Sequence, residues 1–158
     1  NYDPNRPVPR KILEKILEAG RLAPSAKNYQ PWKFLLISSS PLLEKVKASY
    51  QRDWIKDALH ILVLIGLKDE AWNRDYDGYN SVETDVAIAI THIILAAENE
   101  GVGACWIAAY NPVLLKKALN PDKDQVIYGI TPLGYPKPGF QKTLIKKRKS
   151  LEEIVKFL

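Results

Sequence analysis

Apolar residues follow helical spacing near the start of the chain, where a stripe runs from Ile12 to Leu17. This period predicts an amphipathic helix over residues 9–22. Pro9 suits the first turn of that helix, and Pro24 ends it because proline cannot continue a helix. The same reasoning predicts shorter helices over residues 41–50, 51–57 and 112–119, the last with Asn111 as its N-terminal cap.

A longer helix is predicted over residues 85–100, and it is apolar on two sides. At ~100° per residue, Val86 and Ile90 fall on one face, whereas Ile88 and Leu95 fall on nearly the opposite face. Such a helix must be covered on both sides. We therefore expect it either at the centre of the monomer or between the monomer core and a second subunit.

Four stretches have the composition of strands, at residues 32–37, 61–65, 104–107 and 126–133. Residues 61–65 are apolar at every position, which predicts a central strand. The last stretch is interrupted by Gly129 and Pro132, and residues 151–158 are predicted to form a terminal strand or arm. Helices interspersed with four or five strands predict an α+β or α/β sandwich, in one domain over residues 1–158.

The composition narrows the class of protein. The chain has 158 residues, of which 46% are hydrophobic, and no apolar run approaches the ~20 residues of a membrane span. Cys105 is the only cysteine, so no disulfide can form within the chain, and a reducing, cytoplasmic location is expected. Cys105 has apolar neighbours, which predicts a buried core residue. His60 and His92 lie far apart, so we expect no metal site.

The net charge of +5 comes from one segment. Residues 137–149 hold six lysines and arginines and no acid, and removing these six from the 23 basic residues leaves 17 against 18 acids. A local cluster favours a phosphate or another compact anion. A nucleic-acid-binding module is the competing interpretation, but the segment has a single aromatic residue, Phe140, and no recognition motif.

Residues 24–32, Pro-Ser-Ala-Lys-Asn-Tyr-Gln-Pro-Trp, are the strongest candidate for a binding site. They place a hydroxyl, two amides and a large aromatic between a predicted helix and a predicted strand. Asn and Gln amides both donate and accept hydrogen bonds, so they can read the edge of a flat heterocycle.

A second polar stretch covers residues 68–82 and contains Trp72, Tyr76 and Tyr79. We predict a loop or a short mobile helix here. Long loops in compact domains are often functional, so a lid over a substrate is the expected role of these three aromatic residues.

The chain strongly resembles the nitroreductase family, whose members are flavin mononucleotide (FMN) enzymes that reduce nitro groups and quinones. The family pattern P-S-x-x-N-x-Q-P-W stands at residues 24–32 with every named residue in place. Further matches follow in order, at Asp85–Ala89, Gly101–Ile107, Gly134–Pro136 and Lys146–Ile154. Several motifs in the same order make the resemblance specific, and it extends from about residue 2 to the end.

The resemblance implies an α/β/α sandwich whose mixed, mostly antiparallel sheet of four to five strands is flanked by helices. It also implies an intertwined homodimer with an exchanged C-terminal arm and one FMN per subunit in the interface. The residues that it implies for FMN binding are Pro24, Ser25, Ala26, Asn28, Gln51, Trp106, Ala108, Ala109, Lys146 and Arg148.

Ser25 and Asn28 resemble residues that bind flavin held mainly by the partner subunit, and Gln51 matches an amide at the pyrimidine edge. Plainer interpretations stay open, since Ser and Asn are common in turns and Gln51 also suits a solvated helix.

Trp106, Ala108 and Ala109 match a segment whose backbone N–H groups pass the reactive N5 of the flavin. Trp106 also suits ordinary core packing. Lys146 and Arg148 match residues on the FMN phosphate, and the competing interpretation is a solvated basic loop.

The implied reaction is a ping-pong cycle in which NAD(P)H reduces the flavin and a small aromatic or quinone-like acceptor reoxidises it. The flavin carries the chemistry, so no side chain is predicted to be catalytic. The alternatives are another branch of the superfamily, such as a dehalogenase, a flavin-fragmenting enzyme or a dehydrogenase, and a flavin-binding protein without turnover. Neither the physiological acceptor nor the choice between NADH and NADPH follows from these residues.

The start of the chain departs from the family pattern. Family members carry a phosphate-binding arginine segment just ahead of the position that matches Asn1, and this sequence has no methionine. We expect that this N-terminal segment has been removed or omitted.

Overall fold

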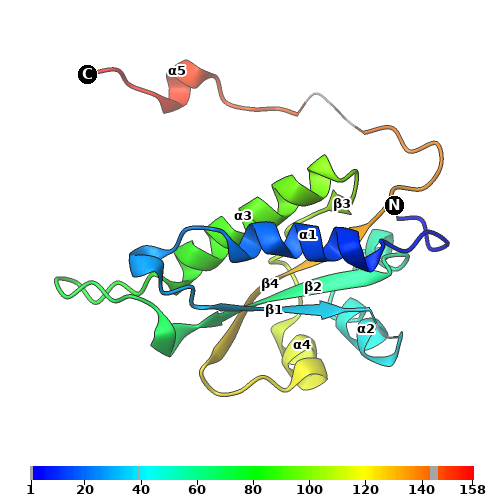
Figure 1. The fold of residues 1–158 in the computed structure, drawn as a ribbon, viewed down its shortest axis with the longest axis horizontal. Coiled ribbons are helices and arrows are strands. Elements are labelled where there is room, and N and C mark those ends of the chain that lie inside the picture. Colours follow the sequence, from blue (N-terminus) through cyan, green and yellow to red (C-terminus); the bar gives the residue numbers. More distant parts are fainter. Residues whose placement is uncertain (1, 39, 143–145) are drawn as a thin grey trace.

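The computed structural model describes residues 2–38, 40–142 and 146–158. Its centre is an α+β arrangement with an antiparallel sheet of four strands in the order β1-β2-β4-β3 (Figure 1). The strands are β1 (Trp32–Ile37), β2 (His60–Leu67), β3 (Gly103–Ala104) and β4 (Gln125–Gly134). The sheet therefore confirms the predicted fold class.

Helices cover both faces of the sheet. The helices α1 (Arg10–Arg21) and α3 (Val82–Asn99) pack together and share a hydrophobic cluster on one face. The helices α2 (Ser40–Lys47) and α4 (Pro112–Leu119) lie on the opposite face. Short 3-10 turns complete the elements, η1 (Ala26–Asn28), η2 (Asp53–Ile55) and η3 (Lys68–Glu70).

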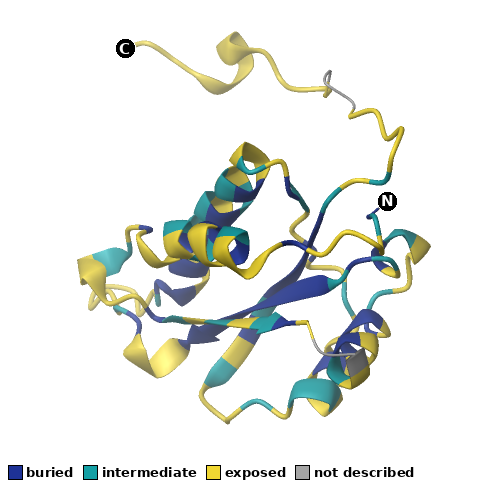
Figure 2. Cartoon of the chain, turned by 45° about the vertical axis from the view of Figure 1, so that its right-hand side comes forward, coloured by how far each residue is buried: buried dark blue, intermediate teal, exposed yellow. Residues whose placement is uncertain are grey.

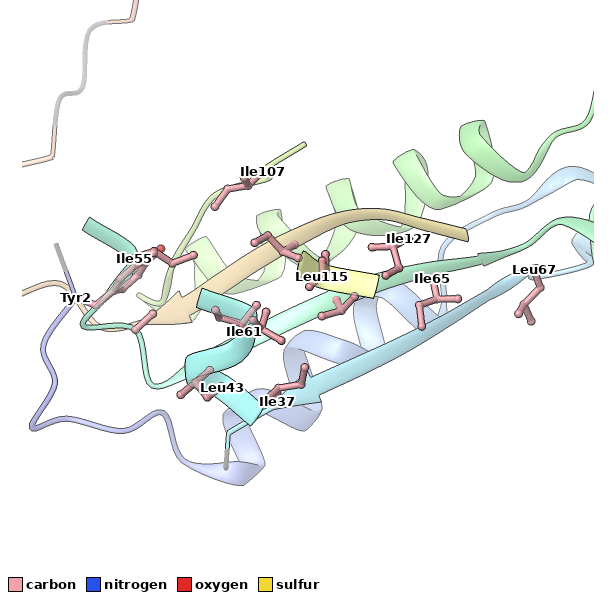
Figure 3. Close-up of a cluster of buried hydrophobic side chains, with 14 residues drawn as sticks. Tyr2, Ile37, Leu43, Ile55, Ile61, Ile65, Leu67, Ile107, Leu115 and Ile127 are labelled. Atoms are coloured by element: carbon pink, nitrogen blue, oxygen red, sulfur yellow. The ribbon is translucent and has the colours of Figure 1, made fainter. Parts of the chain in front are cut away.

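The central strand is β2, as its uninterrupted apolar run predicts. All eight of its residues are buried, because β1 and β4 flank it and helices cover both its faces (Figure 2). Figure 3 shows the cluster beneath α2 and α4, where Leu43 and Leu115 meet Ile61 and Ile65 of the strand.

The strand β4 is continuous through Gly129 and Pro132, so the predicted interruption is wrong. Leu64 pairs with Gly129 and Ile65 pairs with Ile127, which leaves Tyr128 as the extra residue of a bulge. On its other side, among the residues that the structure describes, β4 pairs only with the short β3 and, at Ile130, with an isolated bridge, and proline is tolerated where a ladder partner is missing.

Several predicted boundaries shift. The long helix begins three residues earlier, at Val82, and the strand predicted at 104–107 is reduced to Gly103–Ala104 plus a bridge at Ile107. Cys105 is exposed, which corrects the prediction of a buried thiol, because the chain leaves the sheet at this residue.

The C-terminal segment, residues 146–158, extends away from the sheet (Figure 1). Its single helical turn, α5 (Leu151–Ile154), is capped by the Ser150 side chain, and every residue of the segment is exposed. The segment is therefore an arm, and the alternative of a terminal strand is wrong.

Candidate functional site

The segment after α1 is a tight turn with an unusual backbone. Lys27, Asn28 and Gln30 have positive φ values of 54°, 58° and 53°. A left-handed conformation costs a residue other than glycine about 1–2 kcal/mol. In the described residues, only one further non-glycine position, Asn120, has this backbone. Strain of this kind gathers at binding and active sites, so the turn is the first part of the candidate site.

Hydrogen bonds inside the turn hold this backbone. The Gln30 N–H donates to Ser25 Oγ at 2.9 Å, and Gln30 Nε2 donates to the Asn28 carbonyl at 3.0 Å. Ser25 thus stabilises the turn, as the alternative of an ordinary turn residue predicted. The Asn28 side chain differs, because it is exposed and has no hydrogen-bond partner among the described residues. Asn28 therefore presents both a donor and an acceptor to the outside.

The turn is joined to α3 by a buried carboxylate. Asp85 is only 2% exposed, and its Oδ1 accepts from the Ala26 N–H at 2.9 Å. Its Oδ2 accepts from the Ser81 hydroxyl at 2.7 Å. The sequence pointed to Asp85 only as part of a helix motif.

The second part of the candidate site is a cavity of about 510 Å³ between the end of α2 and the segment before α4. Its lining residues are Ser49, Tyr50, Gln51, Arg52, Ala109, Tyr110 and Asn111. Two predicted site residues, Gln51 and Ala109, thus share one cavity. Sequence reasoning missed the roles of Arg52 and Tyr110 there, since nothing in the local pattern marks them.

Two contacts shape the cavity wall. The Asn111 N–H donates to the Ser49 carbonyl at 2.7 Å, which fastens the segment before α4 to the end of α2. The Tyr110 hydroxyl donates to the Ile127 carbonyl at 2.6 Å, and burial raises the pKa of this hydroxyl. Asn111 also caps α4 through its side chain, as predicted.

The segment leading into the cavity carries Trp106 and Ala108. Trp106 is 42% exposed, and its indole lies over Gly129, where an added Cβ would come within 2.5 Å of Nε1. Trp106 is therefore packed on the sheet on one side and open on the other. The backbone N–H groups of Ala108 and Ala109 have no acceptor in the described part of the chain.

The basic residues of segment 137–149 fall into two groups in the structure. Lys137 pairs with Asp57 at 2.7 Å, and Lys142 pairs with Glu98. Lys146 and the following basic residues are exposed in the C-terminal arm, away from both the turn and the cavity. The structure therefore does not bring Lys146 and Arg148 to the other site residues.

Residues 71–81 form a loop without helix or strand, as one of the two predicted alternatives held, and an isolated bridge between Asn73 and Asn80 closes this loop into a small hairpin. The Arg74 N–H donates to the Tyr79 carbonyl and the Ser81 N–H donates to the Trp72 carbonyl, both at 2.9 Å. Tyr76 lies near the tip and is 97% exposed. The hairpin and the turn lie at the same end of the molecule (Figure 1).

The turn and the cavity lie on different parts of the chain. The turn follows α1 and adjoins α3 on one face of the sheet, whereas the cavity adjoins α2 and α4 on the other. None of the residues that line the cavity comes from residues 24–32. Each chain thus carries two separate sets of candidate binding groups.

Comparison with known proteins identifies the family to which this chain belongs. The model of the nitroreductase family matches residues 1–50 and 40–135, so the chain belongs to the nitroreductase family. Its sequence is 28% identical over 137 residues to a candidate NADH dehydrogenase/NAD(P)H nitroreductase of Archaeoglobus fulgidus, covering 84% of this chain and 77% of that protein. These matches support an oxidoreductase.

Solved structures agree with the family assignment. A nitroreductase family protein from Clostridium difficile 630 has a TM-score of 0.90 and 28% identity, covering 99% of this chain and 90% of that one. An FMN-dependent nitroreductase from Clostridium difficile R20291 has a TM-score of 0.79, with 99% and 91% covered, and at 23% identity it shows the shared fold alone. None of the helices in the described residues is long and apolar enough to cross a membrane.

Proposed function

We propose that this protein is an FMN-dependent oxidoreductase that uses NAD(P)H to reduce nitroaromatic, quinone or similar acceptors by a ping-pong mechanism. The observation that carries the proposal is a set of hydrogen-bonding groups on exposed residues that have no partner within residues 2–38, 40–142 and 146–158. These groups are the Asn28 side chain, the Gln51 side chain and the N–H groups of Ala108 and Ala109.

The residues fit a flavin in chemistry and in size. The pyrimidine edge of a flavin alternates carbonyl and N–H groups, and the amides of Asn28 and Gln51 can pair with both kinds. The cavity of about 510 Å³ beside Gln51 and Ala109 lies within the usual range for ligand sites, about 300–1,000 Å³.

Each predicted residue has a role in the proposed site. Pro24, Ser25 and Ala26 form the turn that presents Asn28, and Trp106 supports the strand-end segment that leads to Ala109. Bound FMN would supply the two-electron hydride chemistry, accepting from NAD(P)H and donating to the acceptor.

The remaining predicted residues act at the edges of the site. When the C-terminal arm lies against the proposed site, Lys146 and Arg148 supply positive charge that attracts the FMN phosphate. The hairpin residues Trp72, Tyr76 and Tyr79 provide aromatic surface that covers a flat acceptor.

The proposed site is completed by a second copy of the chain, because the turn and the cavity lie apart in one copy. Apolar surface on α3 and on the C-terminal arm supports this assembly. Leu95 is 64% exposed on the outer side of α3, and Ile154 and Phe157 are exposed on the arm. A homodimer in which each arm crosses to the partner would bury these side chains.

Flavin uptake and turnover test the proposal directly. FMN is titrated into the purified chain, bound flavin is followed by absorbance, and NADH or NADPH is then added without oxygen. We expect about one FMN per chain, bleaching by the reductant, and reoxidation by a quinone or a nitroaromatic. Light scattering should give a dimer. A full chain that takes up no FMN refutes the proposal, whereas bound flavin without turnover favours a non-catalytic flavin-binding protein.

Two variants locate the binding groups. Asn28→Ala and Gln51→Ala should each raise the Kd for FMN about five- to tenfold, since one hydrogen bond contributes about 1–1.4 kcal/mol. Gln141→Ala is the matched control, because Gln141 is exposed and its side chain has no hydrogen-bond partner among the described residues. Equal affinity in all three variants would contradict the assignment of the two amides.

A further inference from the structure

Asp85 receives hydrogen bonds from two segments that the proposed function uses. One donor is the Ala26 N–H of the turn, and the other is the Ser81 hydroxyl at the base of the hairpin. We propose that Asp85 is a positioning residue that holds the flavin-facing turn and the acceptor-covering hairpin in a fixed relation. This inference rests on the proposed function and deepens it.

On the turn side, Asp85 restrains a strained backbone. Apart from the bond to Asp85, the bonds that residues 25–30 make in the described part of the chain stay within residues 25–32, such as the Asn28 N–H to the Ser25 carbonyl at 3.0 Å and the Trp32 N–H to the Gln30 carbonyl at 2.8 Å. The turn joins the neighbouring strand at Pro31, whose carbonyl accepts from the Leu67 N–H at 2.9 Å. Left-handed residues persist only where the surroundings hold them, so the Ala26–Asp85 bond fixes the entry to the turn.

On the hairpin side, Asp85 holds the residue that closes the hairpin. Ser81 is 2% exposed, and its N–H donates to the Trp72 carbonyl at 2.9 Å. The Ser81 hydroxyl then donates to Asp85. A shift of Ser81 would therefore move Trp72 and the aromatic residues beyond it.

A carboxylate suits this position for two reasons. Both of its oxygens accept, so it can receive one donor from each segment at the same time. It also lies in the first turn of α3, where the helix dipole favours negative charge. An asparagine can keep both contacts, because the Ser81 hydroxyl can reverse and accept from the amide. An alanine keeps neither.

The test compares Asp85→Ala and Asp85→Asn with Val86→Ala. Val86 is the neighbouring core residue of the same helix, so its truncation loosens the core without touching the two hydrogen bonds. Three kinds of measurement are made: hydrogen exchange at the Ala26 amide in flavin-free protein, FMN titration for the Kd, and steady-state kinetics for KM and kcat with a quinone acceptor.

In Asp85→Ala, we expect the Ala26 amide to exchange about tenfold faster and the Kd for FMN to rise about tenfold. Asp85→Asn should stay within about threefold of the natural protein in both quantities. Val86→Ala should unfold at lower urea while its Kd for FMN and its Ala26 exchange rate remain unchanged. A merely structural role would instead make Val86→Ala and Asp85→Ala alike.

Ser81→Ala separates the two sides of the contact, and it also serves if Asp85→Ala does not fold. It removes the hairpin bond and keeps the Ala26 bond, so KM for the quinone should rise about threefold or more at unchanged kcat and unchanged Kd for FMN.

Natural values of both the Ala26 exchange rate and the Kd for FMN in Asp85→Ala would overturn the inference, as would an unchanged KM in Ser81→Ala. If the natural protein binds no FMN, the proposed function fails by itself. The Ala26 exchange rate then still decides whether Asp85 holds the turn.

Discussion

Gly20 allows α1 and α3 to approach each other closely, and Gly20→Ala tests this packing. A Cβ at this position would lie 2.5 Å from both Cγ1 and Cδ1 of Ile93 and 3.2 Å from Cε2 of Phe34. Ordinary carbon contacts are about 3.5–4.0 Å. The Ile93 side chain would therefore have to move by about 1 Å or more, although it is fully buried.

Two effects of opposite sign decide the outcome. Alanine is favoured over glycine inside a helix by about 0.8–1.0 kcal/mol. Overpacking of a well-filled core costs about 1–3 kcal/mol, and we use the higher part of this range because Ile93 is fully buried and the two approaches are as short as 2.5 Å. We expect Gly20→Ala to lower the free energy of unfolding by about 1–2 kcal/mol.

Equilibrium urea unfolding at a fixed protein concentration measures this change, since the stability of a dimer depends on concentration. Ile93→Ala alone should cost about 2–5 kcal/mol. In the double variant, the new methyl group partly fills the space left by Ile93, so the two costs should not add, with a coupling of about 1 kcal/mol or more. A Gly20→Ala variant that is more stable than the natural protein would refute the close packing of the two helices.

Three further predictions concern single polar groups. Thr131 Oγ1 is buried without a hydrogen-bond partner among the described residues, so Thr131→Val should raise the free energy of unfolding by about 1 kcal/mol in urea. Asn111→Ala removes the side-chain cap of α4 and should cost about 1 kcal/mol, which Asn111→Asp should restore. Burial lowers the pKa of His60, whose Nε2 accepts from the Val8 N–H, so the unfolded chain binds more protons than the folded one in mild acid. Stability should therefore fall as the pH drops below about 6.5, and His60→Gln should lose this part of the pH dependence.

Elements with a strong local pattern were predictable from the sequence. The apolar run at 61–65 lies inside the fully buried β2, and the amphipathic stripe before Pro24 forms α1. The Asn111 cap of α4 was also predicted correctly. These features depend on neighbours within a few residues, so their physical causes can be seen in the order of amino acids.

Features that depend on distant partners were not predictable. Gly129 and Pro132 indicate an interruption locally, yet pairing with β2 keeps β4 continuous and places the bulge at Tyr128. Cys105 has apolar neighbours in sequence, but the chain leaves the sheet there and exposes the thiol. Burial depends on how the whole chain packs, so a local sequence pattern does not determine it.

The candidate site likewise has one part that the sequence predicted and another that depends on the tertiary structure. The turn at residues 24–32 is continuous, so its polar groups and its family pattern could be recognised in the sequence by itself. The cavity that joins Gln51 to Ala109, and the contact of Asp85 with Ala26 across 59 residues, exist only after the helices dock on the two faces of the sheet. Hydrophobic burial drives that docking, and its geometry decides which distant polar groups come within hydrogen-bond distance.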